Sequence, residues 1–469
     1  MAQFVLAIVI SIAVLVVLIV KFNVHPVISL FASGMLAGTI LGNDLVTSIT
    51  AIANGFGSTL TSIGMTIIFG AIIACAVRDS GAAKSMVNFF IRLFRGKNLE
   101  LSTGLAAYIM SIPVFGDVTM VLISPLTAII SKRQNKPMGL MSSMTILSLN
   151  LTHSMVPPTP GILAVAVLLG ADLGWVIVWG IVCSFIAYIL TWLLMRKWAA
   201  KDAFEPKPEY VEGIEEVNSN DYRDFLIKED NLPSVLFAMS PILAPVILIA
   251  LSSFASMALA EGNAVRSLLE VIGNRNISMF IGVIFSWLLG ATRKEKTLAS
   301  YNLVTKKNET SIFNCMFNGW VAEALEVALV PLIVTGFGGG FAQIIKNAPA
   351  AAELGDVIAA SNFPGMLVPF IIGAVMECAV GSRTTAGMTA AGLCLPMLGS
   401  LGITPVACAV MIGAGTMIVS HVNDSGWWVS QSMFNMDMKR TFKYNTLVGG
   451  VAGVIAGIAG IVFILIGVM

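Results

Sequence analysis

Charged residues are scarce in this chain, and their scarcity excludes most classes of soluble protein. Only 11% of the 469 residues are Asp, Glu, Lys or Arg, and 57% are hydrophobic, whereas a soluble domain carries about 25% charged residues. The mean hydropathy is +0.89. Since many apolar runs approach the length of about 20 residues that crosses a bilayer, the sequence predicts an all-α polytopic membrane protein.

Sequence motifs that bind metals or cofactors are also missing. The sequence contains no P-loop, no dinucleotide fingerprint and no Cys/His cluster with metal-ligand spacing. Its six cysteines form no CxxC pair and lie in apolar surroundings, so we expect them to be small hydrophobic residues buried in the membrane. The net charge of +1 argues against a nucleic-acid partner. We therefore expect no metal, no cofactor and no ATP-driven pump.

The first apolar run, "QFVLAIVISIAVLVVLIVK", has no basic segment before it and no small-residue cleavage site after it. Signal peptides have both features. We therefore interpret the run as a retained transmembrane helix, and we expect a multi-pass protein of the bacterial inner membrane.

Lysine and arginine set the predicted orientation, because these residues accumulate in cytoplasmic loops. Placing the basic clusters in the cytoplasm leaves only four basic residues elsewhere, namely Arg266, Arg275 and Lys346 outside and Arg383 within the membrane. Both termini are then predicted to be periplasmic.

The first half, residues 1–197, combines spans with two irregular segments. Residues 101–131 start and end inside but are too short for two spans, so a re-entrant hairpin with its tip at "SIPVFGDV" is predicted. A crossing helix at 138–170 is interrupted at "THSMVPPTPG". The other predicted spans of this half are 3–21, 24–42, 54–77 and 174–197.

The second half, residues 234–469, follows a polar cytoplasmic linker at 198–233 and repeats the same order. It contains a hairpin at 363–399 with its tip at "ECAVGSRTT" and a crossing helix at 404–436 that is interrupted at "SHVNDSG". The other predicted spans of this half are 234–258, 276–292, 322–345 and 446–468.

This order predicts two inverted-topology repeats, each with about five spans, one re-entrant hairpin and one broken helix. The number of residues from Gly70 to Gly338 equals the number from His153 to His421, so a single offset aligns both pairs between the two halves. An odd number of spans turns the second repeat upside down. Inverted repeats with interrupted helices are typical of secondary transporters, which bind substrate between the repeats.

Irregular backbone at membrane depth survives only where protein or a water-filled cavity satisfies its polar groups. The prolines at 157, 158 and 160 cannot donate hydrogen bonds and hold one break open. A cavity bordered by helix N-termini attracts anions. The sequence therefore predicts a site that attracts an anion at the two hairpin tips and the two breaks.

Ionisable residues inside a membrane are functional candidates by default. His153 is predicted to carry a proton or to contact substrate, or else to bond structurally across the break. Asp117 is a candidate proton carrier, or else a helix cap. Arg383 is predicted to bind a substrate carboxylate, or else to pair with Glu377. The candidates for substrate binding are His153, Asn150, Thr152, Thr159, Gly116, Ser382, Arg383, Thr384, Asn423 and Ser425; those for proton coupling are Asp117, His153, Asp424 and Glu377.

Several stretches resemble the gluconate:proton symporter (gluconate permease) family of the ion transporter superfamily. They are "GFGSTLTSIGMTIIFGAII", "DSGAA", "IPVFGDV", "THSMVPPTPG", "TGFGGGF" and "VSHVNDSGWW", and together they extend over nearly the whole chain. "SHVNDSG" together with "PPTPG" is a specific pairing. At "GSRTTA" the chain departs from the family, whose members usually have a small residue in place of Arg383.

The resemblance implies a membrane transporter rather than an enzyme. It implies proton-coupled uptake of gluconate-like sugar acids, with D-serine or other small hydroxy acids carried by some relatives. It also implies a scaffold that often forms a homodimer and a part with two hairpins that moves like an elevator. Sodium coupling and a passive channel remain the alternatives at this point.

Overall fold

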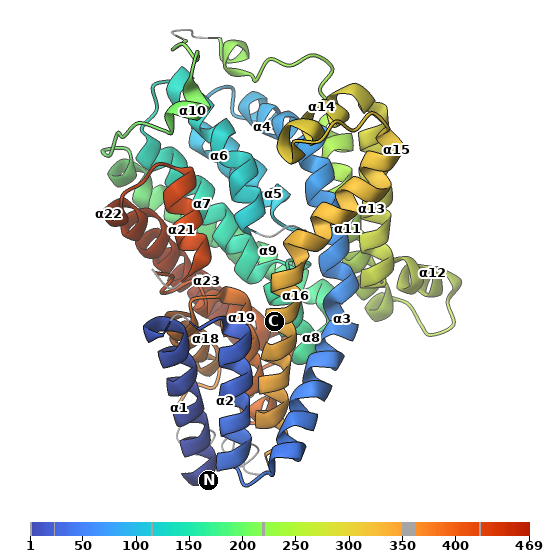
Figure 1. Ribbon diagram of the computed structural model, residues 1–469, viewed down its shortest axis with the longest axis vertical. Coiled ribbons are helices and arrows are strands. Elements are labelled where there is room, and N and C mark those ends of the chain that lie inside the picture. The colour runs from blue at the N-terminus through green and yellow to red at the C-terminus, as the bar shows by residue number, and fades with distance from the viewer. Residues whose placement is uncertain (1, 23, 114–115, 218–220, 349–362, 422–423) are drawn as a thin grey trace.

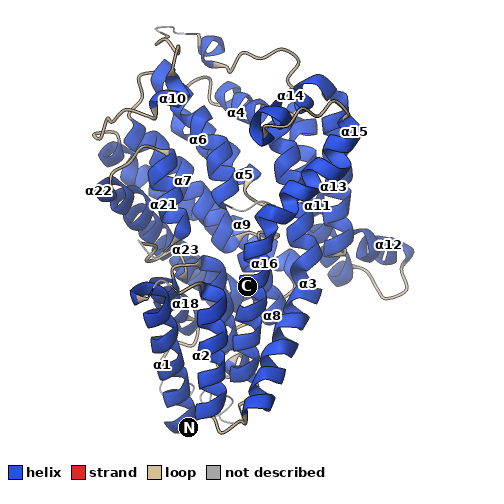
Figure 2. Cartoon of the chain, in the orientation of Figure 1, coloured by secondary structure: helices blue, strands red, loops and turns tan. Residues whose placement is uncertain are grey.

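The computed structural model describes all residues except 1, 23, 114–115, 218–220, 349–362 and 422–423. The described residues form helices and connecting segments, and none of them lies in a β-strand (Figure 2). The all-α prediction is confirmed for this part of the chain. A helix suits a bilayer because it satisfies its backbone N–H and C=O groups within one segment.

Seven helical segments in the described part of the chain are long and apolar enough to cross a membrane. Each contains at least 18 residues, close to the length that a hydrocarbon core of about 30 Å requires. They are Leu45–Asp79 (α3), Met138–Leu168 (α7, Met138–Met155, and α8, Pro160–Leu168), Leu173–Ala199 (α9), Val235–Ala258 (α11), Arg275–Thr292 (α13), Ile312–Lys346 (α15, Ile312–Asn314; η3, Cys315–Gly319; α16, Trp320–Lys346) and Met438–Leu465 (α22, Met438–Thr441; η5, Phe442–Leu447; α23, Val448–Leu465).

Shorter helices complete the molecule. Two of them, α1 and α2, pack against each other at the end that carries the N-terminus (Figure 1). The shorter helices are α1 (Ala2–Val16) with η1 (Val17–Lys21), α2 (Pro26–Ile40), α4 (Ala82–Leu93), α5 (Leu99–Met110), α6 (Gly116–Arg133), α10 (Pro208–Val211), η2 (Tyr222–Phe225), α12 (Ala264–Ile272), α14 (Lys294–Thr305), α18 (Leu367–Val380), α19 (Arg383–Cys394), η4 (Leu395–Met397), α20 (Pro405–Gly415) and α21 (Ser425–Met433).

Four predicted segments agree closely with observed helices, namely 138–170, 174–197, 234–258 and 276–292. The predicted span 54–77 is shorter than α3, which contains 35 residues. This helix begins earlier because the carboxylate of Asp44 accepts a hydrogen bond of 2.9 Å from the backbone N–H of Thr47, which caps the first turn.

The structure contains two pairs of consecutive helices that pack against each other and two pairs of helices separated by a break. The helices α5 and α6 form one hairpin, and α18 and α19 form the other. Residues 156–159 separate α7 from α8, and residues 416–424 separate α20 from α21. In the second hairpin the turn depends on Gly381, whose φ of 68° lies in the left-handed region that favours glycine.

The hairpin of each half packs against the broken helix of the other half. The helix α19 contacts α8, and α6 contacts α21. The helices α7 and α9 pack together, as do α20 and α23, and α9 also packs on α23. These contacts join both halves of the sequence into one bundle around the breaks.

The long helices α3 and α16 cross in antiparallel directions at glycine residues. A Cβ atom on Gly55 would lie 2.4 Å from the carbonyl oxygen of Gly339, and a Cβ atom on Gly339 would lie 1.9 Å from Oγ1 of Thr59. Both distances are too short for a side chain. The glycines of "GFGSTLT" and "TGFGGGF" therefore allow the two backbones to approach closely.

An ion network ties the far ends of these two helices together. Arg78 pairs with the neighbouring Asp79 at 2.8 Å and with Glu323 of α16. The carboxylate of Asp79 also accepts hydrogen bonds of 2.9 Å from Trp320 and from Ser300. Because Asp79 is buried, these partners offset the cost of removing its charge from water.

Of the predicted linker 198–233, residues 198 and 199 belong to α9, and residues 200–217 and 221–233 lie at the end of the molecule opposite the N-terminus (Figure 1). The C-terminal part of the linker is held at Glu229, which pairs with Lys84 and, at 3.3 Å, with Arg293. Asn88 of α4 exchanges two hydrogen bonds of 2.8 and 2.9 Å with the backbone of Ile227. This part of the linker is therefore packed against α4 and α13.

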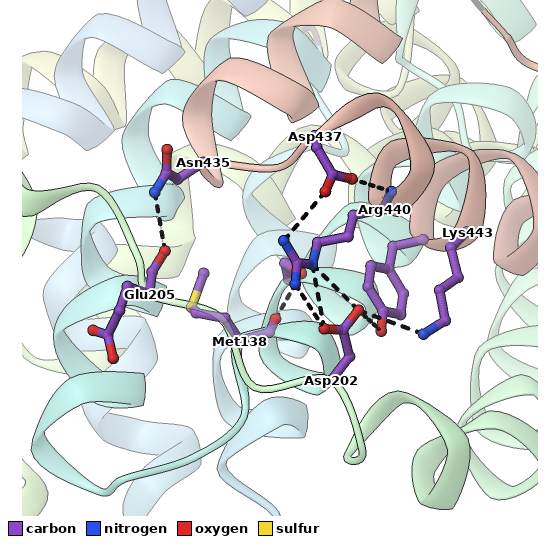
Figure 3. Close-up of polar contacts among 9 residues, drawn as sticks. Met138, Asp202, Glu205, Asn435, Asp437, Arg440 and Lys443 are labelled. Atoms are coloured by element: carbon purple, nitrogen blue, oxygen red, sulfur yellow. Dashed lines mark hydrogen bonds and ion pairs between the residues drawn. The ribbon is translucent and has the colours of Figure 1, made fainter.

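The N-terminal part of the linker is held at Asp202, which follows α9 directly (Figure 3). Its carboxylate accepts hydrogen bonds from Arg440 at 3.2 Å, from Tyr444 at 2.9 Å and from Lys443 at 3.4 Å. Its carbonyl oxygen accepts a hydrogen bond of 3.0 Å from the N–H of Gly139. Asp202 therefore joins the ends of α9, α7 and α22.

Candidate functional site

Three irregular segments that lie far apart in the sequence come together inside the bundle. Arg383 of the second hairpin contacts Asp424 of the second break. A Cβ atom on Gly161, just after the first break, would lie 3.1 Å from Oγ1 of Thr384 and 3.7 Å from the carbonyl oxygen of His153. We define the candidate site as the space around these residues.

The first hairpin reaches the same place. Gly116 begins α6, and a Cβ atom on it would lie 3.9 Å from both Cβ and Cγ of His153. The absence of a side chain on Gly116 therefore leaves the imidazole of His153 room beside the start of α6. The four elements that the sequence singled out converge in the structure.

A buried ion pair lies at the centre of the site. Nη1 of Arg383 lies 3.3 Å from Oδ2 of Asp424, and the two side chains are only 8% and 6% exposed. The structure thus gives Arg383 a partner other than the Glu377 considered from the sequence. Such a pair in a low-dielectric site neutralises two charges that would be costly alone.

Asp424 also holds the break in shape, because it is the N-cap of α21. Its Oδ1 accepts a hydrogen bond of 2.9 Å from the N–H of Gly426, and its Oδ2 accepts one of 2.6 Å from the hydroxyl of Ser420. The carboxylate therefore has a guanidinium, a hydroxyl and a backbone donor. The capping role considered for this residue and its position in the site are both observed.

Glu377 is fully buried in α18, close to this pair. Among the described residues neither of its carboxyl oxygens has a hydrogen-bond partner, and neither does Nε of Arg383. Asp424 and Arg383 are the charged groups that act on Glu377 electrostatically. The site thus contains acceptor and donor atoms that the described part of the protein leaves unsatisfied.

His153 occupies the end of α7 at the first break. Its Nδ1 is buried and has no partner within the described ranges. Arg383 and Asp424 are the charged residues close enough to act on its imidazole. His153 therefore lies within electrostatic range of the pair formed by Arg383 and Asp424, and the roles of these residues stay predictions.

Other predicted binding residues use their polar groups within the protein. The hydroxyl of Thr159 donates to the carbonyl oxygens of Val156 at 2.6 Å and Thr152 at 3.1 Å, so it stabilises the broken backbone. The hydroxyl of Thr152 donates to the carbonyl of Ser148 at 3.0 Å. The hydroxyl of Ser382 caps α19, where it accepts from the N–H of Thr385 at 3.5 Å.

Asn150 belongs to a buried amide network that extends behind the break. Its Nδ2 donates to Oδ1 of Asn445 at 3.0 Å, and Nδ2 of Asn445 donates to the hydroxyl of Ser430 at 3.0 Å. Sequence reasoning missed Asn445 and Ser430. An asparagine at the start of an otherwise apolar span is the signal that would have indicated Asn445.

Three predicted residues cannot be placed in the same way. Asn423 lies outside the described residues, and the side chains of Asp117 and Ser425 lie outside the described part of their helices. Asp117 follows Gly116 in the first turn of α6, and Ser425 is the first residue of α21. Their roles stay predictions.

Cys378 differs from the other cysteines in its exposure on the protein surface. The other five are buried, whereas Cys378, next to Glu377, is exposed. Its carbonyl oxygen lies 3.0 Å from Nε2 of His421, and its Sγ lies 3.9 Å from the same nitrogen.

The chemistry available at the site suits a small anion that also carries hydroxyl groups. The N-termini of α19, α21 and α8 lie at the turn and at the two breaks, and a helix N-terminus favours negative charge. Arg383 adds a fixed positive charge. No group of three or more His, Cys, Asp or Glu residues in the described ranges is placed to hold a metal ion.

Comparisons with known proteins agree over nearly the full length of the chain. The sequence profile described as "GntP family permease" matches residues 3–467. The chain is 27% identical to a gluconate permease of Pseudomonas aeruginosa, over 96% of this chain and 94% of that protein. It is 26% identical to the Gnt-II system L-idonate transporter of Escherichia coli (95% and 97% covered) and 28% identical to the D-serine transporter DsdX of Escherichia coli (95% of each covered).

Two solved transporter structures share the fold. The YdaH transporter of Alcanivorax borkumensis superimposes with a TM-score of 0.62 at 14% sequence identity, covering 94% of this chain and 99% of that one. MtrF of Neisseria gonorrhoeae superimposes with a TM-score of 0.60 at 12% identity, covering 92% and 94%. At these identities the likeness concerns the fold alone.

Proposed function

Since the chain belongs to the GntP family of permeases, we propose that it is a secondary active transporter that takes up a small organic acid of the gluconate or aldonate type together with protons. The chain is a transporter and not an enzyme, and its homologues carry gluconate, L-idonate or D-serine. The proton coupling and the choice of a sugar acid are our proposal.

One observation carries the proposal, namely the buried pair of Arg383 and Asp424 together with the buried carboxyl group of Glu377, which has no hydrogen-bond partner among the described residues. A guanidinium next to helix N-termini matches a carboxylate, which it can bind through two N–H groups. A buried carboxyl group beside it matches a proton, since ionising it without a partner is costly. The site therefore has separate places for an acid and for a proton.

We propose the following roles for the candidate residues. The substrate carboxylate contacts Arg383 and the first turns of α19 and α21. Substrate hydroxyl groups contact His153, whose Nδ1 has no partner among the described residues, and Thr384 across from Gly161. A buried carboxyl group, Asp424 or Glu377, holds the proton. Asn150, Thr152, Thr159 and Ser382 keep the breaks and the hairpin turn in shape.

We propose that the two halves are inverted repeats that carry the site between them. The reciprocal contacts, α19 with α8 and α6 with α21, support this, because a two-fold relation requires both. The glycine-lined crossing of α3 and α16 suits a rigid scaffold, against which the hairpins and breaks move as an elevator. The positive-inside rule places the linker in the cytoplasm of a bacterial cell and both termini in the periplasm. We expect a homodimer.

The experiment that tests the function is a binding panel on the purified protein. Thermal unfolding is measured with gluconate, L-idonate, D-serine, glycerate and a dicarboxylate, at pH 6 and pH 8, with and without sodium. We expect a sugar acid to raise the unfolding temperature, more strongly at pH 6 and without need for sodium, because ligand and proton bind together. Stabilisation only with sodium contradicts proton coupling, and stabilisation only by D-serine contradicts the proposed substrate class.

A further inference from the structure

Asp424 occupies the place where a substrate carboxylate is expected. Its Oδ2 lies 3.3 Å from Nη1 of Arg383, in a site where the arginine is 8% exposed. The chain thus presents its own carboxylate to the guanidinium that would bind the acid. Nε of Arg383 has no partner among the described residues, so the guanidinium is only partly used.

We infer that the substrate carboxylate displaces Asp424 from Arg383 and that Asp424 then takes up the coupling proton. The inference rests on the proposed function, which it deepens by naming the proton carrier. Charge is balanced in this exchange. The incoming carboxylate adds one negative charge, the proton on Asp424 adds one positive charge, and the buried site keeps its net charge.

The surroundings of Asp424 accommodate both protonation states. As a carboxylate, its Oδ2 accepts a hydrogen bond of 2.6 Å from Ser420. When Oδ2 carries a proton it donates to the same hydroxyl, since a hydroxyl group both donates and accepts. Oδ1 continues to accept the N–H of Gly426 at 2.9 Å, so α21 stays capped.

Glu377 suits the role of proton carrier in this exchange less well than Asp424. The part of the chain that the structure describes gives Glu377 no hydrogen bond, so substrate that binds to Arg383 removes no direct partner from it. Asp424 loses its counter-ion at the moment when substrate arrives. The described charged groups that face Asp424 are Arg383 from α19, Glu377 from α18 and His153 from α7.

The exchange explains how coupling can be obligatory. In the empty protein Arg383 and Asp424 neutralise each other, so the empty carrier returns without a proton. In the loaded protein the substrate neutralises Arg383, and Asp424 is neutral only when protonated. A proton therefore does not cross without substrate, and substrate crosses together with a proton.

The test compares Asp424→Asn with Glu377→Gln in proteoliposomes and in solution, with gluconate as the first probe and D-serine as the second. Asparagine is a good N-cap and carries no titratable group. We expect wild-type binding to tighten about tenfold per pH unit as the pH falls, as uptake of one proton requires. We expect Asp424→Asn to bind without pH dependence, to exchange labelled for unlabelled probe, and to lose accumulation driven by a pH gradient. Glu377→Gln is expected to keep the pH dependence.

Each of the other possible results overturns either the proposed exchange or the proposed function. Accumulation driven by a pH gradient in Asp424→Asn overturns the exchange and leaves the proposed function intact. Loss of pH dependence in Glu377→Gln instead names Glu377 as the carrier and overturns the exchange as well. If Asp424→Asn and Asp424→Ser fold but bind neither probe, Asp424 is required for binding and the exchange is wrong. A wild type that binds and transports neither probe overturns the proposed function.

Discussion

Replacement of Asp202 by asparagine is expected to loosen the contact between the end of α9 and the start of the last span. The carboxylate accepts hydrogen bonds from Arg440, Lys443 and Tyr444 at 3.2, 3.4 and 2.9 Å, and its side chain is 18% exposed (Figure 3). Asparagine keeps an acceptor for Tyr444 but removes the anion that Arg440 and Lys443 share, so that Arg440 keeps only its second ion pair, with Asp437 at 3.3 Å, among the described residues.

The magnitude follows from these contacts. A hydrogen bond to a charged group contributes about 1.5–3 kcal/mol, and contributions from one carboxylate are not additive. With partial exposure we expect a loss of about 2–3 kcal/mol in the free energy of unfolding. For a chain of this length that corresponds to roughly 2–5 °C in the unfolding temperature. The control is Glu205→Gln, because Glu205 is 81% exposed and its ion pair with Lys132 at 3.6 Å is expected to contribute less than about 1 kcal/mol.

The effect of Asp202 depends on pH in a defined direction. Burial raises the pKa of this carboxyl, but the hydrogen bond from Tyr444 and the charges of Arg440 and Lys443 outweigh it, so the pKa lies below its usual value. A lowered pKa in the folded state stabilises the protein above the unfolded-state pKa of about 3.9 and loses that contribution as the pH falls through the folded-state value. Thermal unfolding of both variants in detergent at pH 7 and at a pH well below 3.8 is the assay. Equal unfolding temperatures for wild type and Asp202→Asn at pH 7, or an equally large drop in Glu205→Gln, would refute the reasoning.

Three further predictions concern the site and the helix crossing. Arg383→Lys keeps a positive charge but loses the planar fork, so gluconate binding measured by calorimetry is expected to weaken roughly 10- to 100-fold; an unchanged affinity would remove this arginine from the site. Gly55→Ala is expected to destabilise the protein by about 1–3 kcal/mol in thermal unfolding, because its Cβ would lie 2.4 Å from a backbone oxygen. Gly57→Ala on the same helix, with nothing within 4 Å, is the control and is expected to be neutral or stabilising. A maleimide is expected to react with the exposed Cys378, block uptake and be slowed by gluconate, whereas Cys378→Ser resists it; equal inactivation of the serine variant would contradict this.

The spans and the irregular segments were predictable, because local sequence determines both. Apolar runs of sufficient length mark helices that cross a bilayer. Prolines at 157 and 158 and the polar stretch "SHVNDSG" mark breaks that cannot face lipid. The N-terminal extension of α3 was missed because Thr47, Ser48 and Asn54 lower its hydropathy, although Asp44 caps it.

The pairing of residues within the site was harder to predict. Arg383 has Glu377 close by in sequence, on the other helix of the same hairpin, yet its observed partner is Asp424 in a different broken helix. Which carboxylate the guanidinium meets depends on how the hairpin packs against the break, and no periodicity in the chain encodes that.

The most direct test of proton symport uses proteoliposomes that enclose a pH-sensitive dye in sodium-free buffer. Gluconate is added outside at equal pH on both sides. Symport predicts that the interior acidifies as gluconate enters, with Asp424→Asn showing exchange but no acidification. Entry of gluconate without acidification, or entry only after sodium is added, would contradict the account.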